Sequence, residues 1–227
     1  MGLIVIEGLD GSGKSTQIDL LHEFLSRQGC RCNLLHFPRS DASVHGRLIA
    51  RFLRGELGEI HQVNPYLVAL MYADDRLDFK STLEKWLREG NMVLLDRYVY
   101  SNVAYQCAKM QNESEKQALR EWILHLEFVC YGLPKPDLNV YLDVPFTFTQ
   151  RSLTAKRNGA DRKYLQGEKD IHEADLQFQE QVRKTYLSLS GEEGFLKIDC
   201  GNREKMLPVE QVFDKILNGL KARKIKY

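Results

Sequence analysis

The chain has 227 residues, of which 43% are hydrophobic and 28% are charged, and its 32 basic residues nearly balance its 31 acidic ones. This composition is ordinary for a folded globular protein and excludes intrinsic disorder, collagen and a coiled coil as descriptions of the whole chain. The net charge of +1 provides no global positive field that would attract nucleic acid or a membrane surface.

Short apolar segments alternate along the chain with longer segments of helical periodicity. The nearly continuous apolar segments predict strands covered on both faces, at Leu3–Ile6, Asn33–Phe37, Met92–Leu95, Leu138–Val144 and Leu196–Asp199. The longer segments predict helices at Lys14–Gln28, Asn64–Glu89, Glu113–Tyr131, Ala174–Leu189 and Pro208–Lys221. This alternation predicts a three-layer α/β/α fold with a five-stranded parallel sheet, in a single domain that spans residues 1–227.

The segment of residues 151–172 differs from the rest of the chain. It is basic and polar, and it lacks apolar periodicity before Ile171. We therefore expect a surface excursion from the sheet, and a loop of this length inside a compact domain is either functional or disordered.

Cysteine usage and hydropathy bear on the cellular compartment. The five cysteines are scattered and include no C-x-x-C pair, which predicts reduced thiols in a reducing cytosol rather than disulfides or a zinc site. The N-terminal segment lacks the basic and apolar regions of a signal peptide, and no apolar run approaches the roughly 18 residues of a membrane span. We expect a cytoplasmic protein.

The segment that follows the first predicted strand matches the phosphate-loop pattern G-x-x-x-x-G-K-[ST]. It comprises Gly8, Leu9, Asp10, Gly11, Ser12, Gly13, Lys14, Ser15 and Thr16. Because the segment joins a strand to a helix, its backbone N–H groups and the helix dipole can converge on an anion. The pattern predicts binding of a nucleoside triphosphate, with Lys14 on the terminal phosphates and the Ser15 hydroxyl on Mg²⁺.

Arginines outside this loop indicate a second anionic ligand. Arg39 and Arg97 follow two predicted strands, and Arg76 lies inside the long helix. Because parallel strands present their carboxyl ends at one edge of a sheet, we expect Arg39 and Arg97 to converge beside the phosphate loop. Each arginine alone is compatible with a surface salt bridge, but two at successive strand ends favour a second phosphate site. The N-K-x-D base reader of GTP switches is absent from the sequence.

Two carboxylates in this region have alternative interpretations. Asp96 ends an apolar strand, where it can serve a magnesium or phosphate site or form an ion pair with a neighbouring arginine. Asp10 lies inside the phosphate loop and can either accept a hydrogen bond from a sugar hydroxyl or shape the loop.

From Leu3 to about Leu217 the chain resembles the thymidylate kinases, which are P-loop kinases that transfer a phosphoryl group from ATP to dTMP. The most specific motif is D-R-Y-x-x-S-x-x-A-Y-Q, which covers residues 96–106. The other matching segments are E-G-L-D-G-S-G-K-S-T at 7–16, F-P-R at 37–39, Y-A-D-D-R at 72–76, Asp137 with Y-L-D-V at 141–144, and the arginine-rich segment 151–162.

The resemblance implies roles for the residues around the phosphate and sugar of dTMP. The residues that match Arg39 and Arg97 hold the monophosphate in this family, and the one that matches Asp10 binds the sugar 3′-hydroxyl. Tyr105 is implied to crowd the 2′ position and so to disfavour a ribose.

The resemblance also implies a pocket for the thymine base. Tyr72 stacks on the base, where phenylalanine is commoner in the family, and stacking tolerates this difference. Arg76 donates to thymine O4, where cytosine presents an amino donor instead. Asn102 can both donate to and accept from the base edge, while Phe37 and Gln106 line the same pocket.

The basic segment 151–172 resembles the LID that closes over ATP in this family. Some relatives carry a catalytic arginine inside the phosphate loop, where this chain has Gly11. We therefore expect the LID to supply the cation for the transition state, with Arg157 first and Arg162 second, alongside Lys14 and Arg97. The basic residues of the segment are Arg151, Lys156, Arg157, Arg162 and Lys163.

The sequence thus predicts a kinase that makes dTDP from dTMP, with ATP and dTMP as its small-molecule partners and Mg²⁺ as its cofactor. The family forms homodimers, for which the helix Asn64–Glu89 is the candidate face. Two alternatives remain, a deoxynucleoside kinase and a nucleotide-dependent binding switch. The first shares the scaffold but needs less charge for an acceptor phosphate, and the second predicts only slow ATP hydrolysis.

Overall fold

A computed structural model of the chain describes residues 2–154, 164–202 and 205–225. Its main sheet has the strand order β2-β3-β1-β4-β5, and every neighbouring pair is parallel. The strands are β1 (Leu3–Glu7), β2 (Cys32–His36), β3 (Met92–Asp96), β4 (Leu138–Asp143) and β5 (Phe195–Asp199). All five predicted strands are found within a few residues of their expected bounds, and the five-stranded parallel sheet is confirmed.

Burial differs between the central and the outer strands. Every residue of β1, β3 and β4 is buried, as the nearly continuous apolar segments predict. The expectation that all five strands are covered on both faces is wrong for the two edge strands: Leu34 of β2 is 41% exposed, and Lys197 and Asp199 of β5 are exposed. β2 lies at the edge of the sheet and pairs with β3 alone, so fewer neighbours cover its side chains.

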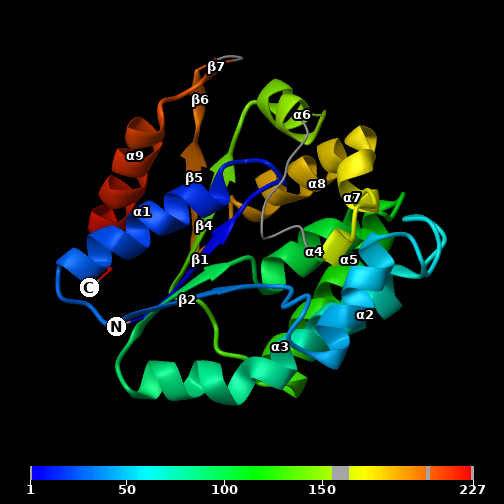
Figure 1. The fold of residues 1–227 in the computed structure, drawn as a ribbon, viewed down its shortest axis with the longest axis horizontal. Coiled ribbons are helices and arrows are strands. Elements are labelled where there is room, and N and C mark those ends of the chain that lie inside the picture. The colour runs from blue at the N-terminus through cyan, green and yellow to red at the C-terminus, as the bar shows by residue number, and fades with distance from the viewer. Residues whose placement is uncertain (1, 155–163, 203–204, 226–227) are drawn as a thin grey trace.

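Helices cover both faces of the sheet (Figure 1). The helices are α1 (Lys14–Arg27), α2 (Val44–Leu53), α3 (Pro65–Arg88), α4 (Val99–Cys107), α5 (Glu113–Leu124), α6 (Phe146–Thr154), α7 (Ile171–Ala174), α8 (Leu176–Leu189) and α9 (Val209–Ala222), with a π-helix η1 (His125–Cys130) directly after α5. A short antiparallel pair, β6 (Gly201–Asn202) and β7 (Lys205–Met206), precedes α9. Among the described residues, no helix is long and apolar enough to cross a membrane.

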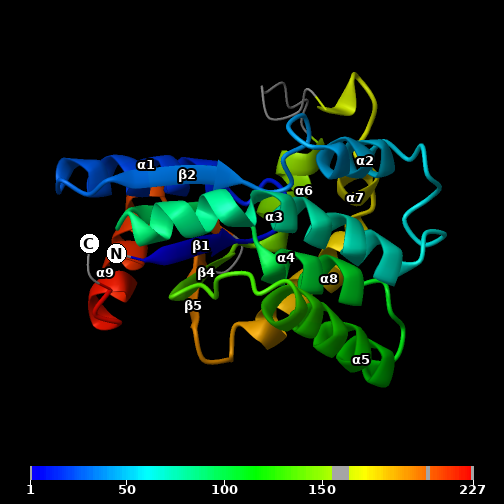
Figure 2. The same ribbon diagram turned by 90° about the horizontal axis from the view of Figure 1, so that it is seen from below.

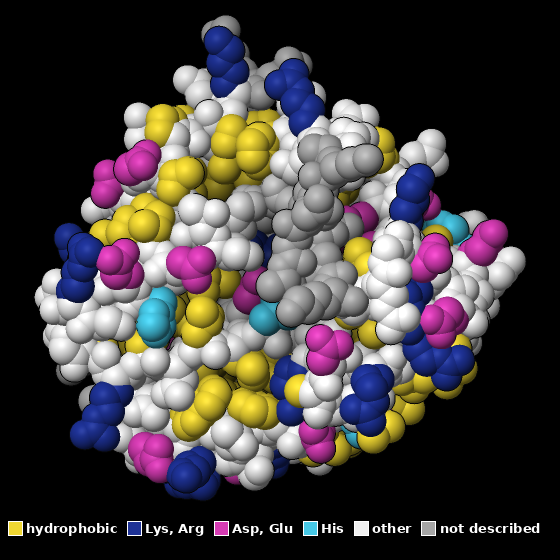
Figure 3. Space-filling view, viewed as in Figure 1, with side chains coloured by type: hydrophobic (Ala, Val, Ile, Leu, Met, Phe, Trp, Pro, Cys, Tyr) yellow, Lys and Arg dark blue, Asp and Glu magenta, His cyan; other side chains and the backbone are white. Residues whose placement is uncertain are grey.

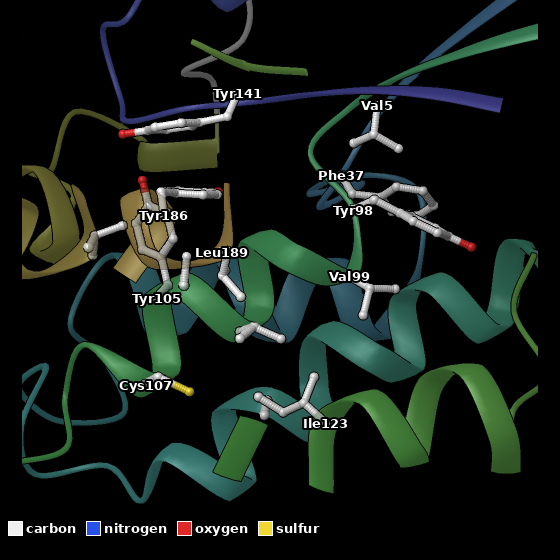
Figure 4. Packing of buried hydrophobic residues seen from close by; sticks show 14 of the residues in the cluster. Val5, Phe37, Tyr98, Val99, Tyr105, Cys107, Ile123, Tyr141, Tyr186 and Leu189 are labelled. Carbon is white, nitrogen blue, oxygen red and sulfur yellow. The ribbon is translucent and has the colours of Figure 1, made fainter. Parts of the chain in front are cut away.

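Alternate residues of β1 belong to separate cores. Ile4 and Ile6 pack in the cluster that contains the apolar residues of α1 and α9, whereas Leu3 and Val5 pack in the cluster of α4, α5 and α8. This period of two is the pleat of a strand buried on both faces. The second cluster includes Tyr141 of β4, whose ring stacks on that of Tyr186 from α8 at 4.9 Å (Figure 4).

Several helices depart from the prediction. α2, α4, α6 and α7 were not predicted, and the predicted helix Glu113–Tyr131 is divided into α5 and the π-helix η1. The view in Figure 2 shows α2 and α7 at one end of the sheet, with both chain ends near the other.

The segment predicted as a surface excursion is partly helical and partly buried. Its first four residues belong to α6, and its last two begin α7. Leu165, Asp170 and His172 are buried. The buried Asp170 side chain accepts hydrogen bonds from the backbone N–H groups that open α7 and from the Tyr164 hydroxyl. Residues 155–163 lie outside the described part of the chain.

Candidate active site

A cavity of about 500 Å³ lies at the carboxyl ends of β1, β2 and β3. The space-filling view is hollowed near its centre, where charged side chains show at depth (Figure 3). Residues of the phosphate loop, of the strand ends and of α3, α4 and α7 line the cavity. Of the residues predicted to bind nucleotides, the lining includes Asp10, Gly11, Ser12, Gly13, Lys14, Ser15, Thr16, Phe37, Tyr72, Arg76, Asp96, Arg97, Asn102, Tyr105 and Gln106.

The phosphate loop forms an anion cradle on the floor of this cavity. Gly13 precedes α1 with a φ of 81°, a left-handed conformation that favours glycine, and no side chain caps the helix. The first N–H groups of α1 are therefore available to an anion. Lys14 is buried here and donates to the backbone oxygens of Gly8 and Leu9, at 3.3 and 2.8 Å.

The protonation of Lys14 is unusual for a lysine. Burial and the nearby Arg97 guanidinium lower the pKa of Lys14 to about 8. Carboxylates at Asp96, Asp10 and Glu7 oppose this shift but do not cancel it. A bound polyphosphate would therefore stabilise the protonated Lys14 amine, because its negative charge favours that form.

Arg97 is the centre of a buried polar network at the end of β3. Its Nη2 donates to Asp10 at 2.7 Å and to the Tyr105 hydroxyl at 3.0 Å, and that hydroxyl donates to Asp10 at 2.7 Å. Burial acts to raise the pKa of Asp10, but Arg97, Lys14 and the Tyr105 hydroxyl hold it well below its usual range. Asp10 is therefore ionised, and it holds the guanidinium at the cavity wall.

Arg39 is not brought to the cavity. Its guanidinium faces α3, where Nη2 donates to Asp75 at 2.9 Å and to Asp78 at 2.7 Å. The Asp75 carboxylate is 1% exposed and also accepts from the backbone N–H of Arg39 and from the Ser43 hydroxyl. The expected convergence of Arg39 and Arg97 beside the phosphate loop is therefore wrong, because the buried Asp75 carboxylate of α3 engages Arg39. Gly8 and Leu9 likewise do not line the cavity.

The residues predicted to contact a base lie on α3 and α4. Tyr72 and Arg76 reach the cavity from α3, and Asn102 and Gln106 reach it from α4. Phe37 adds a buried aromatic ring at the end of β2. The five side chains that the sequence predicted to contact a base therefore line one cavity, although they come from separate elements.

Asp96 has the environment of a metal-associated carboxylate. Its Oδ2 lies 3.1 Å from His36 Nδ1, whereas Oδ1 is buried and has no partner among the described residues. Burial acts to raise the pKa of Asp96, but the His36 hydrogen bond and the Lys14 charge lower it, so the carboxylate is ionised. Ser15 lines the same cavity. The part of the chain that the structure describes has no cluster of three or more His, Cys, Asp or Glu side chains suited to hold a metal alone.

A carboxylate that sequence reasoning missed lies beneath Arg97. Glu7 is fully buried, and its Oε2 accepts hydrogen bonds from the hydroxyls of Ser101 and Tyr186. Ser101 in turn accepts from Arg97 Nη1 at 3.3 Å. A glutamate at the end of an apolar strand was a signal that could have identified this site, since a buried carboxylate needs partners.

A further part of the cavity wall was also not predicted. Tyr164, Asp170, His172 and Glu173 line it, together with Ser152 of α6. Burial and the nearby Asp10 raise the pKa of Asp170 to about 7. The predicted catalytic residues Arg157 and Arg162, with Lys156 and Lys163, lie outside the described residues, and Arg151 is exposed on α6.

Comparisons with known proteins agree on one family. The family model described as thymidylate kinase matches residues 6–216. A thymidylate kinase of Mycobacterium tuberculosis is 33% identical over 191 residues, which cover 84% of this chain and 86% of the relative. A probable thymidylate kinase of Pyrobaculum aerophilum is 34% identical over 206 residues, with 89% and 90% coverage. The solved structure of thymidylate kinase from Candida albicans aligns with a TM-score of 0.70 at 26% identity, covering 98% of this chain and 92% of that one.

Proposed function

Because the chain belongs to the thymidylate kinase family, we propose that it transfers the terminal phosphoryl group of ATP to dTMP and releases ADP and dTDP. The observation that carries this proposal is one cavity shared by two cationic sites. The phosphate loop with Lys14 forms the first, and Arg97 with its Asp10 partner forms the second. A phosphotransferase needs both, because donor and acceptor each bring phosphate charge into the site.

In this proposal the two cationic sites hold the reacting groups in line. The N–H groups at the start of α1 and the Lys14 amine bind the ATP phosphates, and Arg97 binds the monophosphate of dTMP. Asp10 accepts from the sugar 3′-hydroxyl, and Tyr105 closes the space at the 2′ position. The acceptor phosphate is already an anionic nucleophile, so positioning and charge neutralisation dominate and no general base is required.

Ser15 and Asp96 would hold the Mg²⁺ that accompanies ATP. The buried, ionised Asp96 with an unpartnered oxygen suits the cation directly or through a water ligand. When bound, Mg²⁺ neutralises charge on the transferring phosphates. Because magnesium sites of this kind use one or two protein oxygens plus phosphates, the absence of a larger acidic cluster in the described residues fits this assignment.

The base of dTMP would occupy the α3 and α4 side of the cavity. Tyr72 offers a ring for stacking, and Phe37 and Gln106 complete the wall. Arg76 and Asn102 face the base edge in this proposal.

A cation for the transition state is proposed to come from the segment between α6 and α7. The phosphate loop has Gly11 where an arginine would be needed. In the chain, Ser152 precedes Arg157 and Arg162 and Tyr164 follows them, and both Ser152 and Tyr164 line the cavity. We propose Arg157 as the main catalytic cation and Arg162 as the second.

A homodimer through α3 is proposed as the assembly. Leu67 and Leu77 of α3 are 60% and 39% exposed, and Val129 of the adjacent η1 is 65% exposed. Large exposed apolar side chains on neighbouring elements favour an interface. Sedimentation equilibrium of the wild type and of Leu67→Lys tests this proposal, because the charged side chain should shift the population to monomer.

A coupled assay of ADP release tests the function. Purified protein with MgATP should release ADP when dTMP is added, and much less when thymidine is added. A response to thymidine instead would favour the deoxynucleoside kinase, and slow release indifferent to both would favour the binding switch. Lys14→Met serves as the inactive control, because it removes the amine without enlarging the side chain.

A further inference from the structure

A buried carboxylate lies behind the base side of the cavity. Glu127 of η1 is 0% exposed and accepts from Arg76 through both oxygens, at 2.5 Å from Nε and 2.7 Å from Nη2. Arg76 is itself only 2% exposed. The pair therefore fixes the guanidinium plane in a two-bond, fork-like geometry that a single contact would not impose.

The same carboxylate also determines the orientation of the Asn102 amide. Asn102 Nδ2 donates to Glu127 Oε1 and to the backbone oxygen of Ala69, each at 2.9 Å. Both N–H groups of the amide are thereby used. The reversed amide would place its oxygen against two acceptors, so the amide has one permitted orientation.

Consequently, Asn102 presents its oxygen as the group left for a ligand. Asn102 Oδ1 is buried and has no hydrogen-bond partner among the described residues, although the residue lines the cavity. An unpartnered buried acceptor is costly unless something else donates to it. A ligand N–H is the complementary group.

The π-helix explains how Glu127 comes to this position. α5 ends at Leu124, and residues 125–130 continue it with the wider π-turn. Of this segment, Glu127 is the residue buried against α3 and α4. Single π-turns are rare and are frequent at functional sites, because they reorient side chains relative to an α-helix.

We propose that Glu127 is a positioning residue that makes the acceptor site select a base with an N–H at N3 and a carbonyl at C4. The inference rests on the proposed dTMP kinase function and adds the source of its base selectivity. Thymine and uracil both present N3–H to the Asn102 oxygen and O4 to the Arg76 guanidinium. Cytosine presents an acceptor at N3 and an amino donor at C4, so both of its groups meet like groups.

The test compares Glu127→Gln with wild type on dTMP, dUMP and dCMP. The amide keeps the size of the side chain, but because Arg76 donates to both oxygens of Glu127, the glutamine NH2 group meets an Arg76 donor in either orientation. We expect the ratio of kcat/KM for dTMP to that for dCMP to fall about tenfold or more, with most of the loss in KM for dTMP. The ratio for dTMP against dUMP should stay within about twofold, because those bases share the imide edge.

Tyr131→Phe is the matched control. Tyr131 directly follows η1, and its hydroxyl donates to Asp74 of α3 at 2.6 Å, so it ties the end of η1 to the helix that the Glu127–Arg76 pair also engages. It contacts neither Arg76 nor Asn102. Tyr131→Phe should loosen the same interface while leaving the dTMP/dCMP ratio within about twofold of wild type.

Glu127→Asp keeps the inference testable if the glutamine variant does not fold. It retains the charge that Arg76 requires, but withdraws the oxygens by one methylene, so the dTMP/dCMP ratio should again fall. An unchanged ratio in either folded variant, or an equal fall in Tyr131→Phe, overturns the role of Glu127. Failure of the wild type to phosphorylate dTMP would instead overturn the proposed function, so the two failures are distinct.

Discussion

The ends of β2 and β3 carry one arginine each, and the fold uses them differently. Arg97 after β3 lines the cavity and contacts Asp10 and Tyr105. Arg39, three residues after β2, points to α3 and is held by Asp75 and Asp78. The two strands are hydrogen-bonded neighbours, with His36 paired to Asp96. Position at a strand end therefore does not by itself assign an arginine to a ligand, since the nearest buried carboxylate determines where the guanidinium points.

The largest expected effect is on stability, from Arg39→Ala. Among the described residues, it leaves the buried Asp75 carboxylate with the Ser43 hydroxyl and one backbone N–H as hydrogen-bond partners. Removing one member of a buried ion pair costs about 3–5 kcal/mol, and we expect the lower end here because those partners remain. Thermal unfolding should show Tm lower by roughly 6–12 °C. The kcat/KM for dTMP should change less than about threefold, and a larger loss would place Arg39 on the acceptor.

Arg97→Ala should have the opposite signature. It removes the proposed phosphate clamp, and the loss of a charge-assisted contact costs about 1.5–3 kcal/mol. The kcat/KM for dTMP should therefore fall about 10- to 150-fold, while ATP binding measured by calorimetry changes little. If dTMP use fell less than about threefold, the contrast between the two strand ends would be lost.

Tyr105→Phe should have a smaller effect on the Arg97 side of the comparison. It deletes the hydroxyl that joins Arg97 to Asp10 but retains the ring. A hydrogen bond of this kind contributes about 1 kcal/mol, so kcat/KM for dTMP should fall roughly fivefold. Discrimination against ribothymidine monophosphate should persist in Tyr105→Phe and relax in Tyr105→Ala. Equal discrimination in both variants would show that the ring does not face the 2′ position.

The smallest expected effect is a shift in pH dependence. Because burial and Arg97 lower the pKa of Lys14 to about 8, kcat/KM for ATP should fall as the pH rises through this value and the free amine loses its proton. Arg97→Ala removes a neighbouring positive charge, so the pKa of Lys14 rises and the fall of kcat/KM for ATP moves to higher pH. Arg39→Ala should leave the pH of this fall unchanged. A shift in both variants, or in neither, would contradict the assignment of this fall to Lys14.

The strands and the phosphate loop could be predicted from sequence because their signals are local. The continuous apolar run Met92–Leu95 is enough to predict a buried strand, and the glycine pattern before Lys14 is enough to predict a phosphate loop. α4 was missed because every residue from Ser101 to Cys107 is buried, which leaves no polar face and hence no amphipathic period. α2 was missed although Ser43 is an N-cap, since the helix is short and contains Gly46.

The parts of the site that could not be predicted depend on contacts distant in sequence. The partner of Arg39 is 36 residues away, and that of Arg76 is 51 residues away. No spacing rule identifies such partners, and the π-turn of η1 additionally breaks the helical register that would have placed Glu127. Residues predicted through the family motif, such as Tyr105 and Asn102, were nevertheless found at the cavity.

The backbone of Arg97 has a consequence for laboratory evolution of this chain. Its φ of 67° lies in the left-handed region, where a side chain costs about 1 kcal/mol or more and glycine costs little. Arg97→Gly should therefore be more stable than Arg97→Ala, although both lack the guanidinium. Selection for thermostability alone would therefore favour glycine over other small residues at this position, and the proposed phosphate clamp would be lost. A library of variants of this chain should be selected for kinase activity and thermostability together.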